Sequence, residues 1–179
     1  AALCDGWFNS TEFPPYEVHR VRGNSGRYVV PLELEPLLLT GGDWKRDFYR
    51  WLKRPDADGV VLAWSGDGED RRRGDFRLAA DRLPGRAPRV ALPADGVVVE
   101  EEIESHRIRI RTSRPGHPLL VRVSYHPRWR SLGGERIYLA SPGFMLLFPE
   151  RGEVTLEFGD PPLVRFGHLL TAVGCALAA

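Results

Sequence analysis

Aromatic residues with a polar edge are the side chains of this chain best suited to binding chemistry. Trp7, Tyr125, Trp129 and Tyr138 each combine a flat apolar face with an N–H or O–H group. Such a face can pack on the C–H face of a sugar ring while the polar edge reaches a hydroxyl. Aromatic residues also dominate protein cores. These four are therefore candidates for a glycan-binding face, with packing in the core as the alternative.

An acidic run over residues 100–104 is the second group with possible chemistry. In a strand, Glu100, Glu102 and Glu104 would share one face. Glycoside hydrolysis needs two carboxyl groups facing one cleft about 5–10 Å apart. The alternative is a solvated strand face lying opposite the arginines of segment 107–111, where opposite charges favour pairing. We expect the second arrangement.

Metal and cofactor chemistry find little support in the spacing of the remaining residues. The five histidines are scattered without ligand spacing, and two cysteines alone do not make a zinc site. No phosphate-binding loop, no Gly-x-Ser-x-Gly elbow and no His-Glu-x-x-His motif is present in the sequence. We therefore predict no catalytic residue, no metal site and no cofactor in this chain.

Composition bounds the class of protein. The chain has 179 residues, a net charge of +1 and 42% hydrophobic residues. That length and apolar content can bury a substantial core, which excludes a disordered chain. The near-neutral charge argues against a nucleic-acid partner. Cys4 and Cys175 lie near the two ends; they would either form one disulfide closing most of the chain or remain free thiols.

One helix is clearly indicated, over residues 43–54. Asp43 is a suitable N-cap and Pro55 would end the helix. Its apolar residues fall at helical spacing and predict one buried stripe. They are Trp44, Phe48, Trp51 and Leu52.

The rest of the first 95 residues is rich in proline and predicted to be irregular. Short strands are expected at 16–21, 27–32 and 58–64, and Pro31 and Pro36 would either confine the second of these to a sheet edge or break it. Segment 76–83 is predicted as a short helix. The three prolines of segment 84–93 indicate a linker.

From residue 97 the hydrophobic pattern changes to period two. In segment 107–111, Ile108 and Ile110 alternate with arginines and should point inward. Four further alternating or apolar runs, separated by Gly and Pro turns, are expected to be strands. They are 119–125, 136–140, 144–148 and 153–158. This pattern predicts a mainly β fold, an antiparallel, jelly-roll-like β-sandwich with one amphipathic helix. The expected organisation is an irregular half over 1–95 packed on a sandwich core over 96–166.

The same segments carry motifs that resemble a known family. The pattern reads Ser-Tyr-x-Pro-x-Trp, then Ser-Pro-x-x-Met, then Val-Thr-Leu, then a Gly-x-x-Leu-Thr run. Its positions here are Ser124, Tyr125, Pro127, Trp129, Ser141, Pro142, Met145, 154–156 and 167–171. With this pattern the chain resembles the extracytoplasmic C-terminal region of bacterial polytopic membrane proteins labelled "6-pyruvoyl-tetrahydropterin synthase-related", which are related to the YfhO-like group. The helix over 44–51 resembles the segment that precedes this region.

The resemblance implies a parent protein that is a glycosyltransferase-like enzyme using polyprenyl-phosphate-linked sugars. The catalytic loops of that family lie between membrane spans outside this chain, so no catalytic residue transfers to it. The uncharged run 169–179 is too short to cross a bilayer, which takes about 20 residues. Segment 167–179 would be a buried terminal helix or, as the resemblance implies, the start of a transmembrane helix. Arg165 and His168 would then be membrane-proximal.

These observations leave three functional hypotheses. The first is a non-catalytic extracytoplasmic domain, on the periplasmic or cell-surface side of a bacterial membrane, that binds a glycan or lipid-linked sugar. The second is a structural module that assembles with another membrane component and binds no sugar. The third is a stand-alone glycosidase-like enzyme that uses the carboxylates of segment 100–104.

Overall fold

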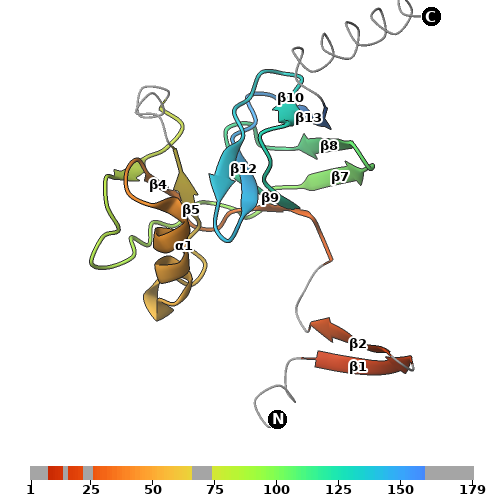
Figure 1. The fold of residues 1–179 in the computed structure, drawn as a ribbon. Coiled ribbons are helices and arrows are strands. Elements are labelled where there is room, and N and C mark those ends of the chain that lie inside the picture. The colour runs from red at the N-terminus through yellow and green to blue at the C-terminus, as the bar shows by residue number, and fades with distance from the viewer. Residues whose placement is uncertain (1–7, 14–15, 22–25, 66–73, 160–179) are drawn as a thin grey trace, which may run out of the picture.

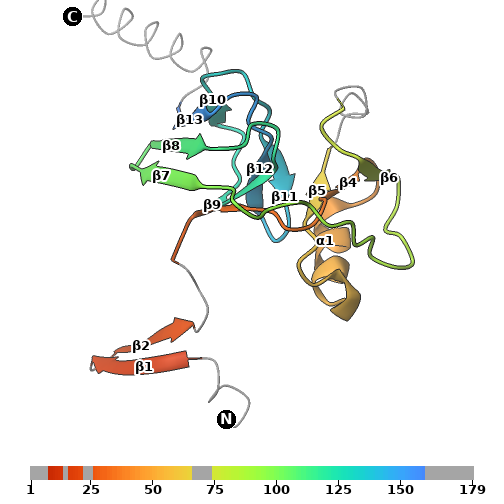
Figure 2. The ribbon, with the colours of Figure 1, turned by 180° about the vertical axis from the view of Figure 1, so that it is seen from behind.

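The computed structural model describes residues 8–13, 16–21, 26–65 and 74–159, with side chains from residue 26 onward. The mainly β class is confirmed, because eleven strands form two sheets (Figures 1 and 2). The four-stranded sheet has the order β10-β13-β8-β7 and the seven-stranded sheet the order β3-β9-β12-β11-β5-β4-β6. A separate antiparallel hairpin pairs β1 (Phe8–Phe13) with β2 (Tyr16–Val21).

The strands of the smaller sheet are β7 (Val99–Ile103), β8 (Arg107–Thr112), β10 (Trp129–Ser131) and β13 (Glu153–Phe158). Those of the larger sheet are β3 (Val29–Pro31), β4 (Leu37–Leu39), β5 (Leu62–Trp64), β6 (Leu78–Ala80), β9 (Leu119–Ser124), β11 (Tyr138–Ala140) and β12 (Phe144–Leu147).

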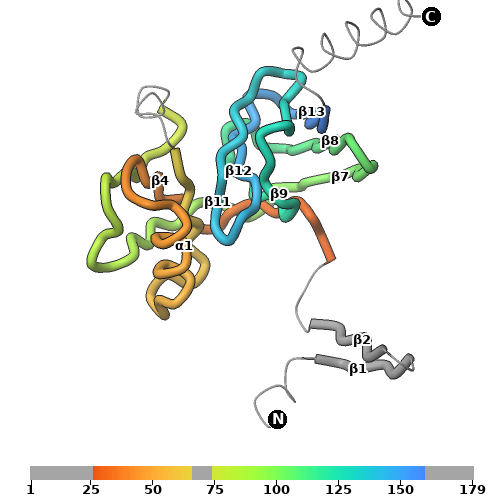
Figure 3. The backbone as a smooth tube through the Cα atoms, in the orientation of Figure 1, coloured from red at the N-terminus to blue at the C-terminus, as the bar shows by residue number. Residues whose placement is uncertain are grey.

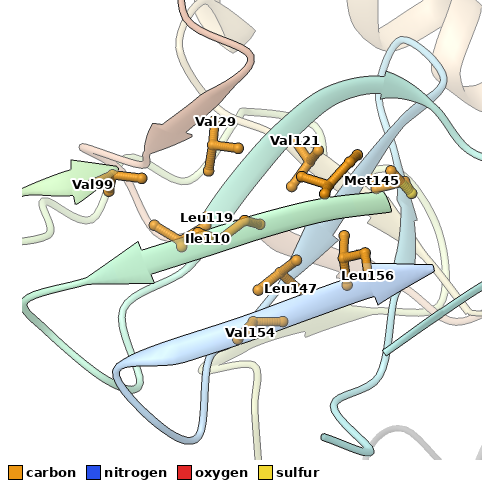
Figure 4. Packing of buried hydrophobic residues seen from close by; sticks show 10 residues of the cluster. Val29, Val99, Ile110, Leu119, Val121, Met145, Leu147, Val154 and Leu156 are labelled. Atoms are coloured by element: carbon orange, nitrogen blue, oxygen red, sulfur yellow. The ribbon is translucent and has the colours of Figure 1, made fainter. Parts of the chain in front are cut away.

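The two sheets pack face to face over the period-two strands that the sequence predicts. Ile108 and Ile110 of β8 point into this core and are almost fully buried, as expected. Leu119 and Val121 of β9 meet them from the larger sheet (Figure 4). Burying such side chains contributes about 1.5–3 kcal/mol each. The alternation therefore builds a sandwich core.

The larger sheet extends beyond this sandwich, and α1 (Trp44–Leu52) covers the extension (Figure 3). Residues directly opposite one another in neighbouring strands share a face. By this rule Met145, Leu139 and Trp64 lie on one face. Met145 packs against the smaller sheet, whereas Leu139 and Trp64 belong to the cluster around α1. One sheet face is thus covered by two different layers, side by side.

The helix begins at Trp44, directly after the predicted N-cap Asp43, and ends at Leu52, two residues before the predicted end. The Asp43 carboxylate accepts N–H bonds from Lys45 and Arg46 at 3.1 and 3.2 Å, and Pro55 opens a short 3-10 helix, η1 (Pro55–Ala57). Trp51 is 1% exposed, and its indole Nε1–H donates to Val60 O at 2.9 Å.

The prediction that Leu52 belongs to the buried apolar stripe of the helix is wrong. Leu52 is 57% exposed, although it lies at helical spacing from Trp44 and Phe48. Trp51 and Phe48 already fill the contact with the sheet, while Leu52 falls at the margin of the buried stripe. Position in the stripe therefore does not place this side chain in the core.

The sequence predicts an antiparallel sandwich, but the larger sheet also contains parallel pairs. β4 pairs in parallel with both β5 and β6. α1 connects β4 to β5, and a helical crossover is the usual way to join parallel neighbours. The expected helix over 76–83 is also wrong, because this segment forms β6 at the sheet edge. Backbone pairing with β4 outweighs the weak local preference of that short segment.

The proline-rich segment 84–93 does not separate two sheets. Strands from before it, β3 to β6, share the larger sheet with β9, β11 and β12 from after it. Within the described residues, the first 95 positions therefore contribute four strands and a helix to the main body, in addition to the hairpin.

The edges of the two sheets meet where β3 lies beside β7. Glu101 of β7 accepts the backbone N–H of Tyr28 at 2.9 Å with one carboxylate oxygen and that of Val29 with the other. The next outward position on β3 is Pro31, which has no N–H. The prediction that residues 27–32 lie at an edge is confirmed, and this edge is already capped.

Several predictions fall outside the described residues. These concern Trp7, Arg165 and His168, the pairing of Cys4 with Cys175, and the run 167–179. In the described part of the chain, no helix is long and apolar enough to cross a membrane.

Candidate functional site

Two of the predicted glycan-binding residues line one cavity. Tyr125 follows β9 and Trp129 begins β10, and both are half-buried in the wall of a cavity of about 300 Å³. The Tyr125 N–H donates to Gly143 O at 2.8 Å, and the Trp129 N–H donates to His126 O at 3.0 Å. The cavity lies at the end of the sandwich where β10 approaches the segment that leads into β11. Its volume is at the lower end of small-molecule sites.

Packing behind Trp129 holds its ring in place. Phe158 of β13 lies opposite Trp129 in the strand register, and the two rings meet edge to face with 5.3 Å between centroids. The ring of His126 lies 5.4 Å from the same Phe158. Trp129 also packs at the margin of the sandwich core. It is therefore a rigid aromatic wall whose remaining surface faces the cavity.

A buried carboxylate completes this cavity. Glu135 is only 7% exposed and lines the wall beside Tyr125 and Trp129. Its carboxylate accepts the hydroxyl of Ser131, and the Ser131 Oγ in turn accepts the N–H of Gly133 at 3.2 Å. A Cβ added at Gly133 would lie 2.5 Å from Glu135 Oε2. The loop after β10 therefore needs glycine at 133 to let the carboxylate approach.

Glu135 also connects this cavity to a second one of about 270 Å³. The second cavity is lined by Asp75, Arg136, Phe148 and Glu150 in addition to Glu135. The Arg136 guanidinium lies 5.4 Å from the centre of the Tyr138 ring. Three carboxylates and one guanidinium make the lining of this smaller space acidic.

Tyr138, the third predicted glycan-binding residue within the described chain, lies apart from this pair. It is 2% exposed, and its hydroxyl donates to Asp75 Oδ2 at 2.7 Å. Its ring packs edge to face on Phe76 at 4.8 Å. The structure thus places Tyr138 in the core, on the opposite face of the larger sheet, where no ring face is open to a ligand.

The acidic run 100–104 forms the expected charged ladder. Glu102 pairs with Arg109 at 3.0 Å, and Glu100 lies 4.0 Å from Arg111. Across β8, Arg111 and Arg107 reach Glu153 and Glu157 of β13 at 3.6 and 3.2 Å. These side chains lie on the outer face of the smaller sheet. Because Glu100 and Glu102 are matched with arginines on an open face, the geometry does not favour paired carboxylates for glycoside hydrolysis.

The histidines do not assemble a metal site in the described residues, where no group of three or more His, Cys, Asp or Glu side chains is placed to hold a metal ion. His117 is buried, and its Nε2 lies 2.9 Å from Leu32 O, so this nitrogen carries the proton that donates to the carbonyl. Burial lowers the pKa of His117 below its ordinary value; the hydrogen bond to Leu32 opposes this shift, and Arg114 adds to it.

A larger cavity of about 670 Å³ lies between the end of α1, η1 and the edge strand β3. Of the two arginines in its wall, Arg54 is already bound to the Asp56 carboxylate at 2.7 Å and to Pro84 O and Gly85 O. Arg54 and the Ala87 N–H hold the pKa of Asp56 well below its usual range. The other charged residues of this wall are exposed. We therefore favour the smaller Tyr125–Trp129–Glu135 cavity as the functional site.

Sequence reasoning found the two aromatic residues of this site and missed Glu135. The only local signal for Glu135 is the Gly133-Gly134 pair before it, which indicates a tight turn but not a buried carboxylate. Comparison of the chain with family models, with curated proteins and with solved structures finds no match.

Proposed function

We propose that this chain is a non-catalytic carbohydrate-binding domain whose site is the Tyr125–Trp129–Glu135 cavity. The observation that carries the proposal is the convergence of two half-buried aromatic rings and one buried carboxylate on the same small space. Small-molecule sites combine apolar or aromatic walls with a few fixed polar groups. A sugar ring matches that combination, since it has apolar C–H faces and hydroxyl groups at its rim.

The proposed setting follows from the sequence resemblance. Under this proposal the domain lies on the extracytoplasmic side of a bacterial membrane and belongs to a glycosyltransferase-like polytopic parent. Its ligand would be a glycan or a lipid-linked sugar, and the chemistry would occur elsewhere in the parent chain. The domain would hold or position the saccharide.

The test is a titration of the 179-residue chain with methyl glycosides of glucose, galactose, mannose and N-acetylglucosamine, followed by NMR shifts of the tryptophan indole N–H groups. We expect the Trp129 signal to move with at least one glycoside. Tyr125→Ala should weaken that binding about tenfold or more, while the chain stays folded because Tyr125 is only partly buried.

Tyr49→Ala is the matched control. Tyr49 is an aromatic residue of α1 that is 61% exposed and does not line the cavity. Its removal should leave glycoside affinity unchanged. Absence of binding to every glycoside, or equal losses for Tyr125→Ala and Tyr49→Ala, would contradict the proposal.

A structural assembly module is the second candidate function. One observation favours it: Tyr49 and Leu52, three positions apart on α1, are both more than half exposed. Neighbouring exposed apolar residues are a common feature of protein contact surfaces. If the chain binds no glycoside but associates with a membrane component through α1, Leu52→Glu should abolish that association.

A further inference from the structure

Buried carboxylates in the described residues fall into two kinds. Three acidic side chains are buried: Glu35, Asp47 and Glu135. Glu35 has the guanidinium of Arg77 at 3.1 Å, and Asp47 has that of Arg46 at 3.8 Å. Glu135 has the hydroxyl of Ser131, and within the described part of the chain no cation pairs with it.

An ionised carboxylate without a cation is costly to bury. Buried charges in proteins are ordinarily paired or bound to a metal, because water that would stabilise them has been removed. One hydroxyl donor satisfies only part of the hydrogen-bonding capacity of a carboxylate. Among the described residues, the Glu135 carboxylate therefore has no cationic partner and keeps unused hydrogen-bonding capacity, and it lies in the wall of a cavity.

The rest of the wall indicates which partner would fit. Tyr125 and Trp129 line the same cavity, and aromatic faces attract cations through their electron-rich π surfaces. On the other side of Glu135, the adjoining cavity adds the carboxylates of Asp75 and Glu150. Arg130 and Arg136, the two basic residues of these walls, have interaction partners of their own. A cationic group is thus favoured at Glu135.

We infer that the ligand of this cavity is a sugar with a free, protonated amine, which places its ammonium group against Glu135 and its ring between Tyr125 and Trp129. This inference rests on the proposed carbohydrate-binding function and adds the substrate class. An ammonium group has three N–H donors, which supply the hydrogen bonds that Ser131 leaves unmade. An N-acetylated or neutral sugar has no such charge and would leave the carboxylate unpaired.

The experiment compares three probes on the intact chain: methyl glucosaminide with a free amine, methyl N-acetylglucosaminide and methyl glucoside. Titrations are run at a pH of about 6, which lies more than a unit below the usual pKa of an α-amino group. We expect the free amine to bind at least tenfold more tightly than either neutral probe. In Glu135→Gln that preference should disappear, while the affinity for methyl glucoside stays within about twofold.

Glu135→Gln keeps the size of the side chain and an oxygen that accepts the Ser131 hydroxyl, so the loop should retain its shape. Thermal unfolding checks this, and we expect the melting temperature of the variant to equal or exceed that of the parent chain, because an unpaired buried charge has been removed. Glu150→Gln is the matched control. It removes an exposed carboxylate of the adjoining cavity and should keep most of the preference for the amine.

The possible failures are distinguishable. Equal affinity for the free amine and the neutral sugars would overturn the inference and leave the carbohydrate-binding function standing. An amine preference that survives Glu135→Gln would also overturn the inference, because another group would then recognise the cation. If none of the three probes binds and the methyl galactoside and mannoside do not bind either, both the proposed function and the inference fail.

Discussion

The outer face of the four-stranded sheet and the cavity beside β10 use carboxylates in opposite ways. On the sheet face, Glu100 and Glu102 are exposed and lie against the arginines of β8. In the cavity, Glu135 is buried, and the partner that the described residues supply is the hydroxyl of Ser131. In the acidic run, Glu100 and Glu102 each have an arginine partner, whereas no cation among the described residues pairs with Glu135. The number of acidic residues in a segment is therefore a poor guide to where a ligand binds; pairing and burial are better ones.

The largest effect on stability should come from Glu101, the ladder's neighbour on the opposite face of β7. Its carboxylate accepts the N–H groups of Tyr28 and Val29 at the meeting of the two sheets. Hydrogen bonds to a charged group contribute about 1.5–3 kcal/mol. Glu101→Ala should therefore lower the free energy of unfolding by about 2 kcal/mol, measured by urea denaturation. A loss no larger than that of an exposed glutamate would mean that this bridge does not hold the sheets together.

Gly133→Ala should damage the cavity more than the fold. The new methyl group would lie 2.5 Å from Glu135 Oε2 and must displace the carboxylate. We expect about a tenfold loss of affinity for an amino sugar, which corresponds to about 1.4 kcal/mol, measured by calorimetric titration. Gly85→Ala is the control, because a Cβ there meets no atom within 4 Å. Equal affinities in the two variants would show that the position of the carboxylate is unimportant.

His117 is a buried basic side chain and can be compared with the buried carboxylate of Glu135. Because its folded-state pKa is lowered, the unfolded chain binds the proton more tightly, so stability is complete above pH about 6.5 and declines as the pH falls below that value. One such group changes the free energy of unfolding by at most about 1.4 kcal/mol per pH unit. Denaturation curves at several pH values should show this decline. In His117→Gln the part due to this group should vanish; an unchanged decline would assign it to other residues.

The smallest effect should come from the ladder itself. Exposed ion pairs contribute about 0–1 kcal/mol and are screened by salt. Glu102→Ala should therefore change the free energy of unfolding by less than about 0.5 kcal/mol, even though its distance to Arg109 is short. Urea denaturation at low and high salt measures this. If Glu102→Ala lowered the free energy of unfolding as much as Glu101→Ala, the outer and inner faces of β7 would contribute equally to stability, contrary to this prediction.

The sandwich half of the fold could be predicted from the sequence, and the helix-covered half only in part. Ile108 and Ile110 alternate with arginines because one face of β8 is buried and the other is open, and such a pattern is visible without a structure. Leu37–Leu39 of β4 is buried on both faces and has no period to read. Segment 76–83 is short and has weak preferences, so its pairing with β4 decides its structure.

The features of the candidate site that depend on residue type could be predicted from the sequence. Those that depend on burial and on neighbouring side chains could not. Tyr125 and Trp129 are glycan-binding candidates because of their residue type, and they line one cavity. Tyr138 is a tyrosine like Tyr125, but it lies in β11 on a buried face of the larger sheet, so its side chain is in the core. That no cation among the described residues pairs with Glu135 is a result of three-dimensional packing, for which a sequence has no local signature.

The capped edge at β3 has a consequence for the behaviour of many copies of this chain together. An open strand edge offers unpaired N–H and C=O groups to another molecule and can seed continuous sheets that run through an aggregate. At β3 the outward N–H of Val29 is occupied by Glu101, and Pro31 has none to offer. The same carboxylate that joins the two sheets therefore also limits strand addition from neighbouring molecules, which favours solubility at high local concentration.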